Sequence, residues 1–215
     1  MNLPARSTVL FDLDGTLADT VDLIVASFKR TISDLLGWAP TEQQCKSWIG
    51  RSLRDTFEGL APGRSQEFVT HYVTWNLANH AGNVHGFPGV NDLLDALRRS
   101  GRNYGVVTSK PLRSAIVSME CADLTDRIDL LATEADTTAH KPAPDPLLHA
   151  LAGLGVAPGD AIYVGDAVVD LQAARAAGMA AIGVTWGAGS AAELAAVEPD
   201  AIVDSAAELR TVLGL

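Results

Sequence analysis

The chain has 215 residues, of which 47% are hydrophobic, and it carries a formal net charge of −10 at pH 7. This length and composition indicate one large globular domain, or one domain that carries a smaller inserted one, and they exclude a disordered chain. The acidic balance argues against binding to nucleic acid or to an anionic membrane. A small anionic substrate is not excluded, because it responds to the local field only.

The two cysteines, Cys45 and Cys121, stand far apart in the sequence. This spacing indicates neither a metal site nor a redox pair, and it is typical of proteins in a reducing compartment. No signal-peptide-like apolar segment precedes the first predicted strand, and no apolar run is long enough to span a bilayer. We therefore expect a soluble protein located in the cytoplasm.

The first part of the chain predicts one buried strand followed only by helices. Residues 8–11 form a short apolar run that is typical of a buried strand. Between residues 20 and 85, apolar residues recur at helical spacing, and four helices are expected at 21–36, 41–50, 51–60 and 64–81. This stretch contains Trp38, Trp48 and Trp75, and we expect these three side chains in its core.

From Pro88 onward, predicted strands alternate with predicted helices. Strands are expected at 104–108, 128–132, 161–165, 180–185 and 200–203, with amphipathic helices between them. Apolar strands that alternate with helices are typical of a parallel sheet covered on both faces. The sequence thus predicts an α/β fold. A Rossmann-like parallel sheet core (residues 1–18 and 86–215) carries an inserted α-helical cap domain (residues 19–85).

The candidate site follows from what stands after each strand, because such sheets bind ligands beyond the carboxyl ends of their strands. The residues found there are four carboxylates, two hydroxyls and two lysines: Asp12, Asp14, Thr108, Ser109, Lys110, Lys141, Asp166 and Asp170. Four neighbouring carboxylates repel one another, and a hard divalent cation such as Mg²⁺ resolves that conflict. Lysines and hydroxyls are the groups that bind phosphoryl oxygens.

A carboxylate is the nucleophile that this set suggests, since neither cysteine follows a strand and no Ser-His-Asp set is apparent. A carboxylate can attack phosphorus, and a second one two residues on can protonate the leaving oxygen and then activate water. Simpler interpretations remain open at this point. Asp14-Gly15 is a common turn pair, and Asp166 with Asp170 is a typical acidic pair at a helix N-terminus.

Four motifs of this chain resemble those of the haloacid dehalogenase (HAD) superfamily, in the right order and over the whole chain. They are Asp12-Leu13-Asp14-Gly15-Thr16-Leu17, Thr108, Lys141 and Gly165-Asp166-Ala167-Val168-Val169-Asp170. The helical segment is similar to the cap of one subgroup. Asp19-Thr20 and Gly86-Phe87-Pro88-Gly89-Val90 resemble the phosphoglycolate phosphatase-like members in particular.

The resemblance implies roles for the charged residues. Asp12 would be the nucleophile and a Mg²⁺ ligand, and Asp14 the acid and base, with its backbone carbonyl on the metal. Lys141 would neutralise charge on Asp12 and on the phosphate. Asp166 would bind Mg²⁺ directly, and Asp170 directly or through water.

Substrate binding is expected from the second motif and from the cap. The resemblance implies that Thr108 binds the phosphoryl group, with Ser109 nearby and Lys110 as a further candidate. Many phosphoglycolate phosphatase relatives have Thr-Asn-Lys where this chain has Thr108-Ser109-Lys110, and Gly-Asp-Thr where it has Gly165-Asp166-Ala167. These two differences weaken the inference that this chain shares their substrate. Arg51 stands between two predicted cap helices, where it could present a cation to the far end of the substrate or simply lie in solvent.

The function implied is a Mg²⁺-dependent phosphatase that acts on a small phosphorylated metabolite, with phosphoglycolate as the first candidate. One alternative is a phosphosugar mutase, although Ile24 stands where such mutases carry a histidine. A second is a catalytically silent module that binds a phosphate ligand. We expect a monomer or homodimer without nucleic-acid or membrane partners. A cap that closes over the site should have hinges near residues 18–20 and 85–86.

Overall fold

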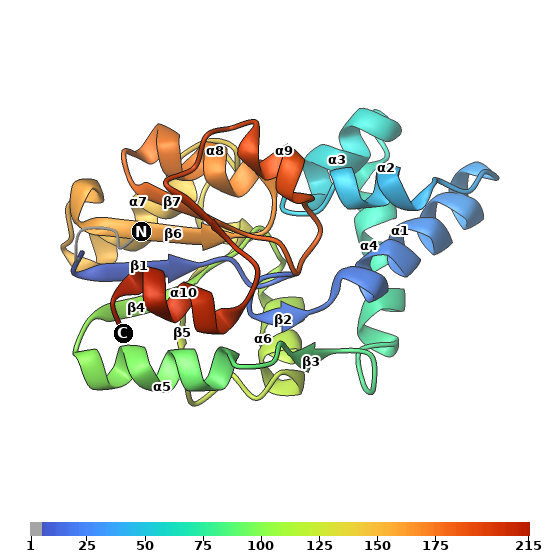
Figure 1. Ribbon diagram of the computed structural model, residues 1–215. Coiled ribbons are helices and arrows are strands. Elements are labelled where there is room, and N and C mark those ends of the chain that lie inside the picture. The colour runs from blue at the N-terminus through green and yellow to red at the C-terminus, as the bar shows by residue number, and fades with distance from the viewer. Residues whose placement is uncertain (1–5) are drawn as a thin grey trace.

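The computed structural model describes residues 6–215 (Figure 1). The strand predicted at the start of the chain is β1 (Thr8–Phe11), and it lies inside a six-stranded parallel sheet. The strand order is β5-β4-β1-β6-β7-β8, with bounds β4 (Asn103–Val107), β5 (Asp129–Ala132), β6 (Ala161–Gly165), β7 (Ala180–Val184) and β8 (Ala201–Val203). The predicted fold class is confirmed. The expectation about an N-terminal signal segment concerns residues 1–5, which lie outside the described part of the chain.

Helices cover both faces of the sheet (Figure 1). One face packs against α5 (Val90–Ser100), α6 (Leu112–Cys121) and α10 (Ala206–Leu213). The other packs against α7 (Asp145–Leu154), α8 (Val168–Ala177) and α9 (Ala191–Ala195). Two short 3₁₀ helices, η1 (Glu134–Asp136) and η2 (Pro158–Asp160), lie in the loops around α7.

The central strands are buried along their whole length, because helices cover both faces of the sheet. In β1, Val9 and Phe11 belong to the cluster on the α5 side, and Leu10 belongs to the cluster on the α7 side. The chain adds β4 and β5 on one side of β1, and β6, β7 and β8 on the other. The connections therefore diverge at β1, which is where open α/β sheets form their ligand crevice.

The inserted segment is helical, as predicted. It contains α1 (Val21–Leu36), α2 (Glu42–Ser47), α3 (Leu53–Leu60) and α4 (Ser65–Ala78), and lies at one end of the sheet (Figure 1). Its core is an aromatic cluster of Phe28, Phe57, Phe68 and Tyr72, with the rings of Phe28 and Tyr72 4.9 Å apart.

The three tryptophans of the segment have different environments. Trp48 packs edge-on against Phe28, with ring centroids 5.2 Å apart. Trp38 is 41% exposed, and Trp75 packs against the sheet-domain cluster. The expectation that all three lie in the cap core is therefore wrong for Trp38 and Trp75. Helical spacing places a side chain on a face of its helix, but not against a particular neighbour.

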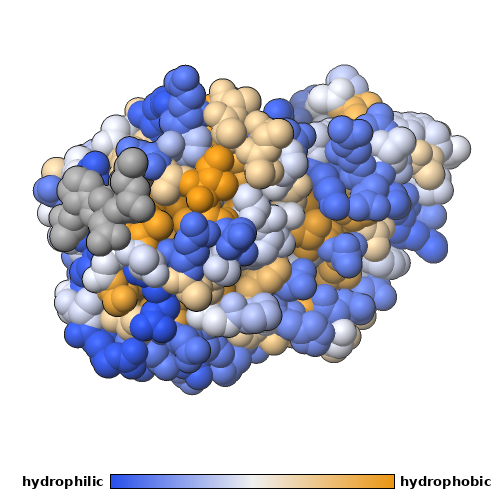
Figure 2. Space-filling model, viewed as in Figure 1, coloured by the Kyte–Doolittle hydropathy of each residue, from blue (hydrophilic) through white to orange (hydrophobic). Residues whose placement is uncertain are grey.

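Two connections join the cap to the sheet domain, and they pair with each other. β2 (Ala18–Asp19) and β3 (His85–Gly86) form a two-stranded antiparallel sheet, with Ala18 opposite Gly86 and Asp19 opposite His85. The domain boundaries expected from the sequence, at residues 18–19 and 85–86, are residues of this pair, and the division into two domains stays a prediction. In Figure 2 most of this face of the molecule is hydrophilic, and apolar residues show at the junction between the cap and the sheet domain. Across residues 6–215, no helix has the length and apolar character needed to cross a membrane.

Candidate active site

Three aspartates from two strand ends meet at the carboxyl edge of the sheet. One carboxylate oxygen from each of Asp12, Asp166 and Asp170 lies within 4.8 Å of the others, and all three residues are buried. Asp12 directly follows β1, Asp166 directly follows β6, and Asp170 lies in the first turn of α8. The sequence prediction that these residues converge therefore agrees with the structure.

Lys141 lies inside this group of carboxylates. Its Nζ donates to Asp12 Oδ1 at 2.9 Å, to Asp170 Oδ1 at 2.6 Å and to the hydroxyl oxygen of Tyr163 at 3.1 Å. Tyr163 in turn donates to the carbonyl oxygen of Val107 at 2.7 Å. Burial lowers the pKa of Lys141, but Asp12 and Asp170 more than offset it, so the pKa stands well above its usual value. Lys141 is thus held as a cation against the predicted nucleophile.

Asp166 is fixed from two directions. The hydroxyl of Thr16 donates to its Oδ1 at 3.1 Å, and the backbone N–H of Ala188 donates to its Oδ2 at 2.7 Å. Gly15 lies against the same carboxylate with a φ of +73°, and a Cβ at this position would collide with Asp166 Oδ2. Glycine is therefore required in the first motif both for the left-handed backbone and for the close approach.

The position of these aspartates disfavours their ionised forms. Burial, together with the neighbouring charges of Asp170 and Asp14, raises the pKa of Asp12 from 3.8 to about 7, and the opposing effect of Lys141 is smaller. Burial, with the charges of Asp170 and Asp12, raises the pKa of Asp166 well above its usual value. These shifts describe the protein without a cation, in which ionised carboxylates are disfavoured.

Asp14 has a lysine of its own. The Nζ of Lys110 lies 2.7 Å from Asp14 Oδ1, and the hydroxyl of Thr20 donates to the same oxygen at 2.7 Å. Both partners are buried. The structure therefore places Lys110 in the site, next to the acid and base that the resemblance implies.

The donor set fits a divalent cation. The site contains four carboxylates, of Asp12, Asp14, Asp166 and Asp170, but only two ammonium groups. When all these groups are ionised, two negative charges remain, and buried unpaired charge is costly. Mg²⁺ prefers a few carboxylates together with water and phosphate oxygens. Asp12, Asp166 and Asp170 are the side chains that would hold it.

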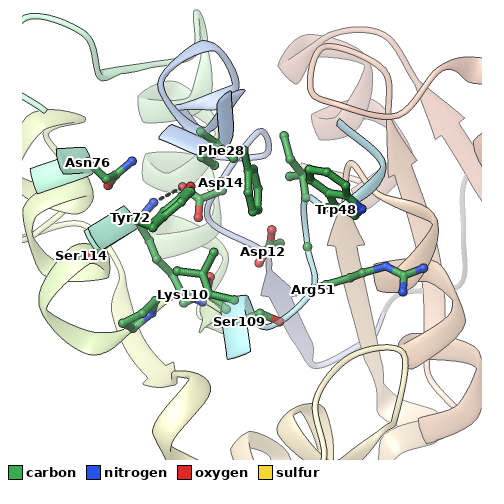
Figure 3. Close-up of a pocket in the computed structure, with 16 residues that line it drawn as sticks. Asp12, Asp14, Phe28, Trp48, Arg51, Tyr72, Asn76, Ser109, Lys110 and Ser114 are labelled. Atoms are coloured by element: carbon green, nitrogen blue, oxygen red, sulfur yellow. Dashed lines mark hydrogen bonds and ion pairs between the residues drawn. The ribbon is translucent and has the colours of Figure 1, made fainter. Parts of the chain in front are cut away.

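A small cavity of about 40 Å³ separates these residues from the cap (Figure 3). Asp12, Asp14, Thr108, Ser109 and Lys110 line its sheet side. The cap side is lined by Ile24, Phe28, Trp48, Ile49, Leu53, Tyr72 and Asn76.

Arg51 also lines the cavity, but its side chain is exposed and its guanidinium extends away from Asp12 (Figure 3). The structure thus brings eight of the nine predicted residues to one site and places the charged group of the ninth outside the cavity.

Several residues at the site carry no signal in the sequence. Tyr72 and Asn76 belong to the helical pattern of α4, and Ser114 belongs to that of α6. Tyr163 stands within the apolar strand β6. Their roles depend on contacts between distant segments, and no local pattern reports such contacts. Thr16 lies within the first motif and Thr20 just after it. A hydroxyl side chain close to this motif is the signal by which the sequence could have identified them.

Comparison with known proteins agrees with this geometry. Residues 9–184 match the family described as haloacid dehalogenase-like hydrolase. A pyrophosphatase PpaX from Anoxybacillus flavithermus is 34% identical over 209 residues, which are 97% of each chain. A haloacid dehalogenase-like hydrolase from Bacteroides fragilis has 29% identity and a TM-score of 0.87, over 95% of this chain and 99% of the other. CbbY from Rhodobacter sphaeroides, solved with phosphate, has 25% identity and a TM-score of 0.83, over 98% and 100%.

A parallel sheet with a helical insertion, and paired aspartates after its first strand, make this an α/β protein with an acidic site at the carboxyl edge of its sheet. The chain belongs to the haloacid dehalogenase-like hydrolase family. Within this family it is a phosphatase, and the enzyme class predicted from its motifs is confirmed.

Proposed function

We propose that this protein is a Mg²⁺-dependent phosphatase that hydrolyses a small phosphomonoester through an aspartyl-phosphate on Asp12. The observation that carries the proposal is the position of Asp12. It is buried, paired with Lys141 at 2.9 Å, and part of the wall of a cavity that Asp14 and Thr108 also line. A carboxylate so placed can reach a phosphorus atom bound in that cavity.

The first half-reaction transfers the phosphoryl group to the protein. The carboxylate of Asp12 attacks phosphorus, the bond from phosphorus to the ester oxygen breaks, and the carboxylic acid of Asp14 protonates the departing oxygen. Thr108 and the hydroxyl of Ser109, which has no partner in the described part of the chain, are available to the phosphoryl oxygens. Lys141 fixes the orientation of Asp12 through its contacts with Asp170 and Tyr163.

The second half-reaction releases phosphate. Asp14 is now a carboxylate and takes a proton from a water molecule, whose oxygen attacks phosphorus and displaces Asp12. Lys110 and Thr20 hold Asp14 Oδ1 during both transfers and leave Oδ2 to exchange the proton. When bound, Mg²⁺ supplies positive charge that stabilises the phosphoryl oxygens in the transition state.

Two phosphorylated compounds are the first candidates for the substrate. The motif resemblance suggests phosphoglycolate first, and the relative from Anoxybacillus flavithermus is named a pyrophosphatase. In both phosphoglycolate and pyrophosphate the leaving group carries a negative charge. The charge of the cavity wall therefore decides which leaving groups can bind. A mutase is disfavoured because Ile24, which lines the cavity, cannot transfer protons to a sugar. A silent binding module is disfavoured because every group that the reaction needs is present.

The assembly and compartment expected from the sequence remain part of this proposal. Cys45 and Cys121 are both free thiols, which supports a cytoplasmic location. Light scattering coupled to gel filtration distinguishes a monomer from a homodimer.

The reaction is tested with p-nitrophenyl phosphate and MgCl₂. We expect Asp12→Asn to reduce kcat/KM by more than about 1,000-fold, as loss of a nucleophile does, and EDTA to abolish turnover reversibly. Asp92→Asn, an exposed aspartate on α5, is the matched control and should retain wild-type rates. Full activity of Asp12→Asn, or of the wild type in EDTA, contradicts the proposal.

A further inference from the structure

The cavity beyond the phosphoryl position has one apolar wall. The cap contributes Phe28, Trp48 and Ile49 to it, and Figure 3 shows Phe28 and Trp48 facing the space above Asp12. Because Asp12 attacks the phosphorus atom in the proposed reaction, the phosphoryl end of the substrate lies next to Asp12. The departing part of the substrate therefore lies against these cap side chains.

The positively charged groups that line the cavity are either paired or extend out of it. Among its lining residues, Asp12 and Asp14 are anionic and only Lys110 and Arg51 are cationic. Lys110 is paired with Asp14 at 2.7 Å, and the guanidinium of Arg51 extends away from the cavity (Figure 3). In the described part of the chain, no unpaired cation faces the departing group. A carboxylate or second phosphate there would be desolvated without a partner, which is costly.

A polar feature marks the opposite side of the cavity. Ser114, on α6, is 2% exposed, and its Oγ has no hydrogen-bond partner among the described residues. Asn76, on α4, is 1% exposed and lines the same cavity, with its amide nitrogen donating to Ser27 Oγ at 2.8 Å. Buried hydroxyls without partners are rare, and each calls for a reason. A ligand hydroxyl in the cavity would supply the missing partner.

We propose that Ser114 and Asn76 select the departing group, and that the substrate is the phosphate ester of a short, uncharged alcohol bearing a second hydroxyl. This inference rests on the proposed phosphatase reaction and adds the substrate class to it. The alkyl chain packs on Phe28 and Trp48, and the second hydroxyl bonds to Ser114 Oγ. The small volume of the cavity, about 40 Å³, limits the alcohol to a few heavy atoms while the cap is closed.

Three small esters of similar length test this selection. 2-Hydroxyethyl phosphate carries the second hydroxyl, ethyl phosphate lacks it, and phosphoglycolate replaces it by a carboxylate. Inorganic pyrophosphate is the fourth compound. We expect kcat/KM for 2-hydroxyethyl phosphate to exceed each of the others by about tenfold or more, because the others leave a buried polar group or charge unpaired.

Ser114→Ala tests the residue itself. Because its hydroxyl has no partner among residues 6–215, removing it should leave the thermal midpoint unchanged or raise it. The preference for 2-hydroxyethyl over ethyl phosphate should nevertheless fall to about one tenth of its wild-type value. Ser100→Ala, an exposed serine at the far end of α5, should retain the full preference. Asn76→Leu gives a second, independent measurement of the same ratio.

The outcomes separate this inference from the proposed reaction. If phosphoglycolate or pyrophosphate is the best substrate and turnover still requires Asp12, the selection by Ser114 is overturned and the phosphatase reaction stands. An unchanged preference in both Ser114→Ala and Asn76→Leu also overturns the selection. If neither these compounds nor p-nitrophenyl phosphate is hydrolysed, the proposed reaction itself fails, and the inference fails with it.

Discussion

The ammonium group of Lys110 lies 2.7 Å from the Oδ1 of Asp14, and this pair is buried at the carboxyl edge of the sheet. Asp12, two residues earlier, is paired with Lys141 at 2.9 Å. Each aspartate of the first motif thus has a separate lysine. The arrangement keeps the predicted nucleophile and the predicted acid and base in different electrostatic environments, which is how two carboxylates acquire two roles.

The Lys110–Asp14 pair predicts a strong effect of breaking it. Lys110→Met leaves a buried carboxylate without its cation, and we expect the free energy of unfolding to fall by about 3 kcal/mol. The double variant Lys110→Met/Asp14→Asn should recover most of this loss, because it removes the uncompensated charge as well. Urea unfolding of the two variants measures the difference. Equal stability of the single and double variants would show that the pair is not coupled in the folded protein.

We expect Asp166 to lower the stability of the metal-free protein and to contribute to Mg²⁺ binding. Asp166→Asn removes a carboxyl group whose ionised form burial disfavours, and it keeps the contacts of that group. The amide oxygen can accept from Ala188 and the amide nitrogen can donate to Thr16. In EDTA we expect the variant to be at least as stable as the wild type. Addition of MgCl₂ should raise the thermal midpoint of the wild type only. A variant that is less stable in EDTA, or that keeps the Mg²⁺ shift, contradicts the assignment.

The pKa of Asp12 predicts how stability depends on pH in EDTA. Its folded-state pKa of about 7 lies above the ordinary value of 3.8. Between about pH 4 and pH 7 the folded protein therefore keeps a proton that the unfolded chain releases. The free energy of unfolding should fall as the pH rises through this window, by on the order of 1 kcal/mol per pH unit for this group.

Urea unfolding at pH 5 and pH 7 measures that slope. Asp12→Asn should have a smaller slope than the wild type, while Asp92→Asn should keep the wild-type slope. Identical slopes for Asp12→Asn and the wild type would mean that Asp12 does not hold the proton.

Contacts between the cap and the sheet domain predict an effect on substrate binding. Ser52, just before α3, donates to Glu134 Oε1 at 2.9 Å, and Asp55 lies 3.0 Å from His140 Nδ1. Glu134→Ala removes the first contact and should favour an open cap. We expect KM to rise by about threefold to tenfold, the effect of one hydrogen bond, with little change in kcat. Glu120→Ala, an exposed change on α6, is the control, and a KM equal to the control would argue against closure through this contact.

The sequence predicts the sheet and the acidic cluster at its carboxyl edge because both depend on local patterns. Apolar strands followed by polar residues locate Asp12, Asp166 and Lys141 without any knowledge of the cap. β2 and β3 escape prediction because strands of two residues have no periodicity. The hinge expected near residues 18–20 and 85–86 stays a prediction. Ser114 escapes prediction for another reason. Only the packing of α6 against the cap makes this helical serine a buried hydroxyl that has no partner within residues 6–215.

Attack by Asp12 on phosphorus can be tested chemically, by trapping the aspartyl-phosphate. The protein is mixed with substrate and MgCl₂, quenched in acid during turnover and reduced with borohydride, which converts an aspartyl-phosphate into homoserine. Mass spectrometry of the peptide that contains residues 8–17 then locates the modified position. We expect homoserine at position 12 in the wild type and none in the unreacted protein. Rapid phosphate release with an unmodified residue 12, or modification at position 14 instead, would contradict it.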